Sequence, residues 1–177
     1  MKAQFKIVEL TQLSSENIDH LCNVLIDCVA GGASVSFLHP MTYEKAQNFW
    51  QHVAKGLSNK ERKILVAIDD TQTIIGTIQL ITQLPENQPH RADVSKLLVH
   101  SSARCMGVGA ALVDAVDALA LAHGRSLLVL DTVTGSTADK LYRRQGWQFS
   151  GEIPAYAMFP DGRYCPTSVF YKNLSAQ

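Results

Sequence analysis

Two periods of hydrophobic and polar residues run along this chain of 177 residues. Apolar residues at every second position, or in a short continuous run, predict a strand, and apolar residues every three or four positions predict an amphipathic helix. The first pattern predicts strands over residues 5–10, 64–68, 74–81, 91–99, 126–132, 147–152 and 167–172. The second predicts helices from the Ser14-Ser15 cap to Gly31-Gly32, over about 42–56, over 107–122, and from Ser136 to Arg144.

The order of these elements is β-α-α-β-β-β-α-β-α-β-β, which is typical of an α/β (α+β) architecture. We expect a central mixed, mostly antiparallel sheet of about seven strands, flanked by about four helices. The chain is long enough to bury a core and contains neither an internal repeat nor a linker. Residues 1–177 are therefore expected to form a single domain.

Composition narrows the class of partner. Hydrophobic residues make up 46% of the chain and charged residues 18%, and 16 basic and 16 acidic side chains give a formal net charge of zero. This balance gives no support for nucleic acid as a partner. No apolar run reaches the length of a membrane span, and the N-terminus lacks a signal-peptide core, so no membrane association is expected. The four cysteines are scattered, which favours free thiols in a cytoplasmic protein, and the six histidines show no metal-binding spacing, so no metal is expected.

The segment 97–110 carries the most specific chemical signal. A short apolar strand from Leu97 to Val99 leads through a turn to a helix whose start is marked by Gly107 and Gly109. The first amides of a helix have no intrahelical acceptor, and the helix dipole adds about half a positive charge there. Because glycine leaves these N–H groups uncovered, the sequence predicts a site for a diphosphate.

Two other phosphate-binding motifs are excluded. A dinucleotide fingerprint requires a third glycine where Leu112 stands, and it belongs to a first βα unit rather than a position about a hundred residues along. The chain also lacks the Gly-Lys-Ser/Thr sequence of a phosphate-loop NTPase.

Together with the element order, two motifs make the chain resemble the GNAT superfamily of acetyl-CoA-dependent N-acetyltransferases. One is Arg-x-x-Gly-x-Gly at 104–109, after the strand that ends at Val99, and the other is Leu-Tyr-x-x-x-Gly-Trp at 141–147. Further segments are similar to the tabtoxin-resistance type of acetyltransferase, namely 31–35, 91–94, 96–97, 102–104, 130–132 and 160–163. The resemblance implies the GNAT fold, acetyl-CoA as cosubstrate, and transfer of the acetyl group to a primary amine.

The resemblance also implies that coenzyme A lies along the strand end and the start of the helix. The residues expected to bind it are Leu98, Val99, Arg104, Met106, Gly107, Val108, Gly109, Ala110 and Ser136. Val99 would act through its backbone, by pairing with the pantetheine amides as an added strand. Arg104 is expected either to contact a phosphate or to be a surface arginine. Many relatives have glycine at Cys105, a basic residue at Met106 and asparagine at Gly135. These departures weaken side-chain contacts to coenzyme A but leave the backbone donors in place, and whether the Cys105 thiol is reactive stays open.

Acetyl transfer to an amine requires a base for the acceptor's proton and a donor for the leaving thiolate. Tyr142 is the candidate acid, because the resemblance places a tyrosine at this helix position near the thioester sulfur; its alternative role is packing. Asp131 ends an apolar strand, where ligands gather in open sheets, and Asp93 lies on the strand that leads to the glycine turn. Alternation along that strand puts Asp93, Ser95 and Leu97 on one face. Either carboxylate, directly or through water, is the expected base.

The acceptor is expected to bind between two walls. Gly32, Ala33 and Ser34, in the loop after the first helix, form one wall, and Tyr156 in the last hairpin belongs to the other. The closer resemblance implies a small-molecule amine, for example an amino-acid-like toxin or antibiotic, and hence a role in resistance. The alternatives are acetylation of a protein or peptide amine, and a non-catalytic GNAT-fold sensor or binding protein for acyl-CoA. GNAT proteins often dimerise, so a homodimer is compatible with the resemblance.

Overall fold

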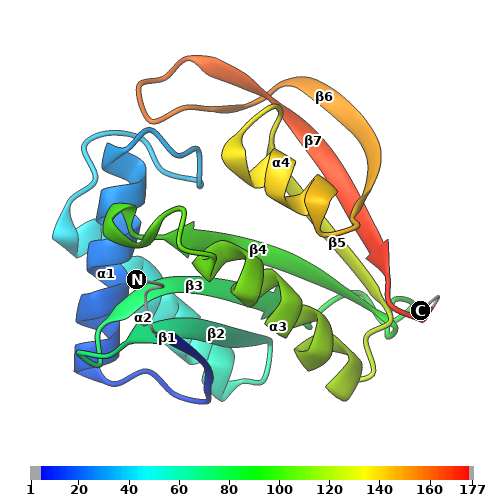
Figure 1. Cartoon of the computed structure of the whole chain (residues 1–177), viewed down its shortest axis with the longest axis horizontal. Helices are drawn as coiled ribbons and strands as arrows, with labels where there is room; N and C mark the ends of the chain where they lie inside the picture. The colour runs from blue at the N-terminus through cyan, green and yellow to red at the C-terminus, as the bar shows by residue number, and fades with distance from the viewer. Residues whose placement is uncertain (1–4, 176–177) are drawn as a thin grey trace.

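The computed structural model describes residues 5–175 (Figure 1). Its elements, in chain order, are β1 (Phe5–Leu10), α1 (Ser15–Ala30), α2 (Tyr43–Ser58), β2 (Arg62–Asp69), β3 (Ile74–Ile81), β4 (Arg91–Val99), the 3₁₀ helix η1 (Ser101–Ala103), α3 (Val108–Ala122), β5 (Leu127–Val133), α4 (Thr137–Arg144), β6 (Gln148–Met158) and β7 (Tyr164–Asn173). The predicted order of strands and helices is confirmed. The one added element is η1, which the sequence patterns describe only as a turn.

The strands of the described chain form one sheet in the order β1-β2-β3-β4-β5-β7-β6. Neighbouring strands are antiparallel except β4 and β5, which run parallel, so the predicted mixed, mostly antiparallel sheet is confirmed. β4 pairs with β5 only over Arg91–Asp93 and Leu127–Val129. Beyond these residues the two strands diverge, and the sheet opens into one half made by β1 to β4 and another made by β5, β7 and β6 (Figure 1). This divergence makes room for the site.

Helices cover both faces of the sheet. α1 and α2 pack on one face, in a core that includes Leu21, Trp50 and Ile64. α3 packs on the other face around Leu80 and Leu112, and α4 joins that core through Tyr142.

The helix starts follow from local chemistry. Ser14, Thr42 and Ser136 each accept a hydrogen bond from the amide three residues further on, and Ser14 with Asn17 completes a capping box. α3 is different. Its N-cap is Gly107, which has a left-handed φ of 87° and no side chain to close the first turn. α1, α2 and α4 therefore each begin with one amide bonded to a capping side chain, and α3 begins without such a cap.

A bulge in β4 corrects one prediction. Lys96 has a φ of 53°, and the pairing of β3 with β4 shifts between Ser95 and Leu98. One extra residue reverses the alternation of the strand, so Leu97 packs in the same core as Val94. The prediction that Asp93, Ser95 and Leu97 share a face is therefore wrong for Leu97.

The last hairpin is longer than predicted. β6 extends to Met158, six residues beyond the predicted end at residue 152, and it passes through Pro154 and the left-handed Ala155. β6 lies at the edge of the sheet, where a proline removes no ladder hydrogen bond, and its pairing with β7 skips from Ile153 to Ala157. The strand continues past the irregularity and carries Tyr156 to the site.

Candidate active site

A cavity of about 1260 Å³ lies where β4 and β5 diverge. Its walls come from the loop after α1, the second half of β4, the β4–α3 loop with the start of α3, the end of β5, α4, and the β6–β7 hairpin. We distinguish two ends. The amide end consists of residues 105–110. The carboxylate end consists of Lys96, Asp131, Tyr142 and the loop 31–38.

The amide end presents backbone N–H groups with no acceptor. Within residues 5–175, no hydrogen bond is donated by the amides from Cys105 to Ala110, and the first amide bonded in the usual helical way is that of Ala111, to Gly107 O at 3.0 Å. Cys105 and Gly107 are both left-handed, an arrangement that turns successive N–H groups toward a common point. With the helix dipole behind them, these donors make a site for a phosphate group.

Gly107 and Gly109 serve this end in different ways. A Cβ on Gly107 would meet no protein atom within 4 Å, so the space before this residue is open. A Cβ on Gly109 would lie 3.3 Å from Leu141 Cδ2, so glycine here allows α4 to approach α3 closely. Val108 is buried in the core, and Gly107, Val108, Gly109 and Ala110 all line the cavity, as expected for residues that bind through their backbone.

The strand end beside these amides is partly occupied. His100 N donates to Ile75 O at 2.9 Å, so the alternation of an antiparallel ladder turns the amide and carbonyl of Val99 toward the diverging side. The Val99 carbonyl accepts from Arg104 Nε at 3.2 Å and from Cys28 Sγ at 3.5 Å. The backbone of Val99 therefore offers its N–H to an added strand, whereas its carbonyl already has partners.

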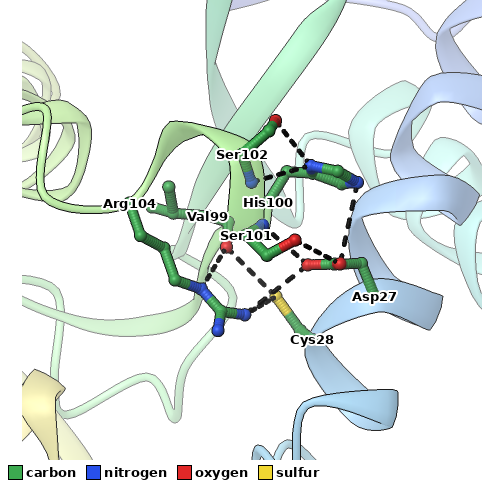
Figure 2. Close-up of polar contacts among 7 residues, drawn as sticks. All are labelled: Asp27, Cys28, Val99, His100, Ser101, Ser102 and Arg104. Atoms are coloured by element: carbon green, nitrogen blue, oxygen red, sulfur yellow. Dashed lines mark hydrogen bonds and ion pairs between the residues drawn. The ribbon is translucent and has the colours of Figure 1, made fainter.

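Figure 2 shows that Asp27, in the last turns of α1, holds the loop between β4 and α3. Its carboxylate accepts from the Ser101 amide and from Ser101 Oγ, both at 2.7 Å, and lies 3.5 Å from the Arg104 guanidinium. Although partial burial opposes ionisation, the bonds from Ser101 and the neighbouring cations lower the pKa of Asp27. His100 Nε2 lies 3.7 Å from the same carboxylate, and its Nδ1 is 2.8 Å from Ser102 Oγ.

The side chain of Arg104 is thus engaged with Asp27, Val99 and Cys28 (Figure 2). A contact between this guanidinium and a phosphate stays a prediction, and it would require the side chain to leave at least part of this arrangement. In the structure, Arg104 supports the loop that carries the open amides.

Tyr142 lies on α4 with its ring packed between Trp147 and Phe170 and only 5% of its surface exposed. Its hydroxyl has no hydrogen-bond partner within residues 5–175, yet it is not sealed in the core, because the residue lines the cavity. Burial, and then the charge of Asp131, raise the pKa of the phenol well above its usual value. The phenol therefore stays protonated and is free to donate a hydrogen bond into the cavity.

Asp131 lies on β5 just beyond the residues paired with β4, and its carboxylate faces the cavity. Burial raises its pKa, the charge of Lys96 opposes that rise, and Asp93 adds to it. A raised pKa makes the carboxylate a stronger base than an ordinary aspartate.

Asp93 occupies a different position from the one that the sequence suggests. It lies where β4 and β5 are still paired, opposite Val129, and it forms an ion pair with Arg91. It is not part of the cavity wall. The structure thus brings Asp131 and Tyr142 together and leaves Asp93 outside, with an influence on Asp131 through charge alone.

The predicted acceptor walls meet at the carboxylate end. Ser34 Oγ donates to Met158 O of β6 at 2.6 Å, and His39 N donates to Pro160 O at 3.0 Å, so the loop after α1 is tied to the β6–β7 hairpin. Gly32, Ala33, Ser34 and Tyr156 all line the cavity.

Of the remaining residues predicted to bind coenzyme A, two line the cavity and one does not. Leu98 lines the cavity but buries its side chain in the core under α1 and α2. Ser136 lines the cavity, and its hydroxyl is used to cap α4. Met106 is 47% exposed and is not among the residues that line the cavity.

Sequence reasoning missed Lys96 and Asp27. Lys96 reaches the cavity because of the bulge, which no residue type in 91–99 signals. Asp27 stands on the polar side of an amphipathic helix and looks like a solvated acid until its contacts across 74 residues to Ser101 are seen. In residues 5–175 no cluster of three or more metal-ligating side chains occurs, and no helix is both long and apolar enough to span a membrane. The prediction that no metal is needed stays a prediction.

Comparison with known proteins identifies the class. A family model described as the acetyltransferase (GNAT) family matches residues 22–147, so the chain belongs to this family of acetyltransferases. An uncharacterized N-acetyltransferase from the hisH–hisA intergenic region of Azospirillum brasilense is 29% identical over 127 residues, which cover 71% of this chain and 73% of that protein.

Two solved structures show the same fold. An N-acetyltransferase from Staphylococcus aureus Mu50 aligns with a TM-score of 0.79 at 17% identity, over 97% of this chain and 99% of that one. A GNAT superfamily phosphinothricin acetyltransferase from Sinorhizobium meliloti, solved in complex with AcCoA, aligns with a TM-score of 0.78 at 16% identity, over 98% and 89%. The similarity to the tabtoxin-resistance type in particular stays a prediction.

Proposed function

We propose that this single-domain protein is an acetyl-CoA-dependent N-acetyltransferase that acts by direct attack of a small-molecule primary amine. One observation carries the proposal: a single cavity joins the unpaired backbone amides at the start of α3 to a carboxylate of raised pKa and to a tyrosine hydroxyl that has no partner within residues 5–175. The phosphinothricin acetyltransferase of the same fold was solved with bound AcCoA, which supports acetyl-CoA as the cosubstrate.

The amide end fits the diphosphate of coenzyme A. The amides from Cys105 to Ala110 would hold the phosphate oxygens, and the N–H of Val99 would pair with the pantetheine arm. When bound, acetyl-CoA supplies the acetyl group as a thioester. Because the donors belong to the backbone, cysteine at 105 and methionine at 106 do not remove them.

At the carboxylate end, Asp131 and Tyr142 have different roles: one accepts a proton and the other donates a hydrogen bond. Asp131 receives the proton that the acceptor nitrogen loses as the C–N bond forms, directly or through water. Tyr142 donates a hydrogen bond to the sulfur as negative charge develops on it. A thiol has a pKa of about 8.5, below that of the buried phenol, so full proton transfer from Tyr142 would be uphill, and stabilisation of the thiolate by hydrogen bonding is the favoured role.

A thiol-release assay with a panel of amines tests the proposal. We expect acetyl-CoA to bind and coenzyme A to be released only when an amine is present, with the N-acetylated product found by mass spectrometry. Tight binding of acetyl-CoA without turnover of any amine would instead indicate a sensor, and turnover of peptide amines alone would indicate a protein acetyltransferase. The proposal has three further parts: the acceptor is an amino-acid-like toxin or antibiotic, the protein is cytoplasmic, and it forms a homodimer.

A further inference from the structure

Lys96 is held in an unusual position at the carboxylate end. Its left-handed backbone lifts it out of the β-ladder, and its ammonium donates to Ser36 Oγ at 3.0 Å. Ser36 is itself left-handed, with a φ of 81°. Two non-glycine residues in a costly conformation therefore face each other across one hydrogen bond, and such strain concentrates at functional sites.

The charge of Lys96 has no acidic partner in contact. Within residues 5–175 no ion pair involves this lysine. Its Nζ lies 5.8 Å from the centre of the Phe49 ring. Burial lowers the pKa of Lys96, the charge of Asp131 raises it, and Arg62 lowers it further. An ammonium can donate three hydrogen bonds. One of them is used by Ser36, so the group can still bind an anion.

Lys96 and Asp131 face the cavity from the two diverging strands. They influence each other's charge without forming an ion pair. A ligand that bridges them needs an anionic group for Lys96 and an amino group for Asp131. The loop 31–38, which carries Ser36, closes the space between them on one side.

We propose that Lys96 is a specificity-determining residue that binds a carboxylate of the acceptor, so that the acceptors are amino acids or amino-acid-like amines. This inference rests on the proposed function and narrows it to one substrate class. Binding the carboxylate at Lys96 places the amino group toward Asp131 and the sulfur-facing Tyr142. An amine that lacks a carboxylate would leave the ammonium of Lys96 without its anion and would bind less tightly.

The experiment compares acceptors with and without a carboxylate. A panel of amino acids is assayed beside the matching carboxamides and decarboxylated amines, with the wild-type protein, Lys96→Met, Lys96→Arg and Lys60→Met. Lys60→Met is the matched control, because Lys60 is also left-handed, at φ 61°, but is exposed and lies outside the cavity.

We expect the wild type to prefer amino acids over carboxamides in kcat/KM by about tenfold to a hundredfold, the range for a hydrogen bond to a charged group. Lys96→Met should abolish this preference through the KM for the acceptor, Lys96→Arg should restore part of it, and Lys60→Met should keep all of it. The Kd for acetyl-CoA should be the same in all four proteins.

Three outcomes would overturn the inference: turnover of amines without a carboxylate as fast as amino acids, no turnover of any amino acid, or a Lys96→Met variant that keeps the preference. The first leaves the proposed function standing. Absence of acetyl-CoA binding in calorimetry would overturn the proposed function itself, so the two failures are distinguishable.

Discussion

The two ends of the cavity differ in the kind of chemical group that they present. The amide end consists of consecutive backbone groups on one short segment, whereas the carboxylate end assembles side chains from β4, β5, α4 and the loop after α1. A backbone site tolerates replacement of its side chains as long as the chain keeps its path. A side-chain site changes its chemistry with every replacement. We therefore expect the first end to set affinity for the cosubstrate and the second to set rate and acceptor choice.

The largest effect is expected for Asp131→Asn. Loss of the base should lower kcat by about a hundredfold or more, the usual range for general base catalysis. The raised pKa of Asp131 means that the wild-type kcat should fall as the pH drops through a value above that of an ordinary aspartate, because the protonated carboxyl cannot accept a proton. The asparagine variant should lose this acidic limb. A kcat profile at saturating acceptor checks both points, and an unchanged limb would assign the base to another group.

Tyr142→Phe is expected to have the next largest effect. Removing one hydrogen bond to a developing thiolate should lower kcat about tenfold to a hundredfold. The hydroxyl has no partner within residues 5–175, so the midpoint of thermal unfolding should stay within about one degree, given that 1 kcal/mol corresponds to a few degrees in a domain of this size. The Kd for acetyl-CoA should change only a few-fold. Full activity of the phenylalanine variant would exclude tyrosine from the mechanism.

Gly107→Ala tests the amide end. A side chain in this left-handed position costs about 1 kcal/mol of stability, and its Cβ would enter the open space before the amides. We expect the Kd for coenzyme A to rise about tenfold, by loss of one or two charge-assisted hydrogen bonds, with kcat nearly unchanged.

Gly124→Ala is the matched control for this change. Gly124 is left-handed too, at the other end of α3, and a Cβ there would also meet no protein atom within 4 Å. Both variants should lose similar stability in chemical denaturation, and only Gly107→Ala should bind coenzyme A more weakly. Equal affinities would remove the open amides from the site.

The smallest effect is expected for Met106→Ala. This side chain is exposed and lies outside the cavity wall, although it stands in the middle of the amide end. The Kd for coenzyme A should change by less than about twofold, as for an ordinary surface substitution. A larger loss would show that the amide end depends on side chains, and the contrast between the two ends would disappear.

The difference between the ends also explains what the sequence could predict. Apolar periodicity and capping residues define most elements, since Ser14, Thr42 and Ser136 each sit at a helix start. The amide end was predictable for the same reason: it is local, and its two glycines are separated by a single residue in the chain. Residues that work through the backbone are recognisable from a short motif.

The carboxylate end was predictable only in part. Tyr142 was predicted from its helix motif and Asp131 from its place at the end of an apolar strand. Asp93 was predicted as an equal alternative to Asp131, because the point where β4 and β5 stop pairing cannot be read from either strand alone. Lys96 was missed because nothing in its residue type signals a left-handed bulge. Contacts across the fold, such as those of Asp27 with Ser101 and Arg104, depend on tertiary packing and leave no local pattern.

The hydrogen bonds from Ser101 to Asp27 bear on which parts of the protein can change in sequence independently of one another. Asp27 accepts the hydrogen bonds of Ser101 within α1, whereas the loop 31–38, the proposed acceptor wall, begins only after this helix has ended. Insertions or replacements in residues 33–38 would therefore leave the hydrogen bonds between Asp27 and Ser101, which hold the β4–α3 loop, in place. On the proposed function, changes at these loop positions would alter the choice of acceptor, while the segment expected to bind coenzyme A would keep its structure.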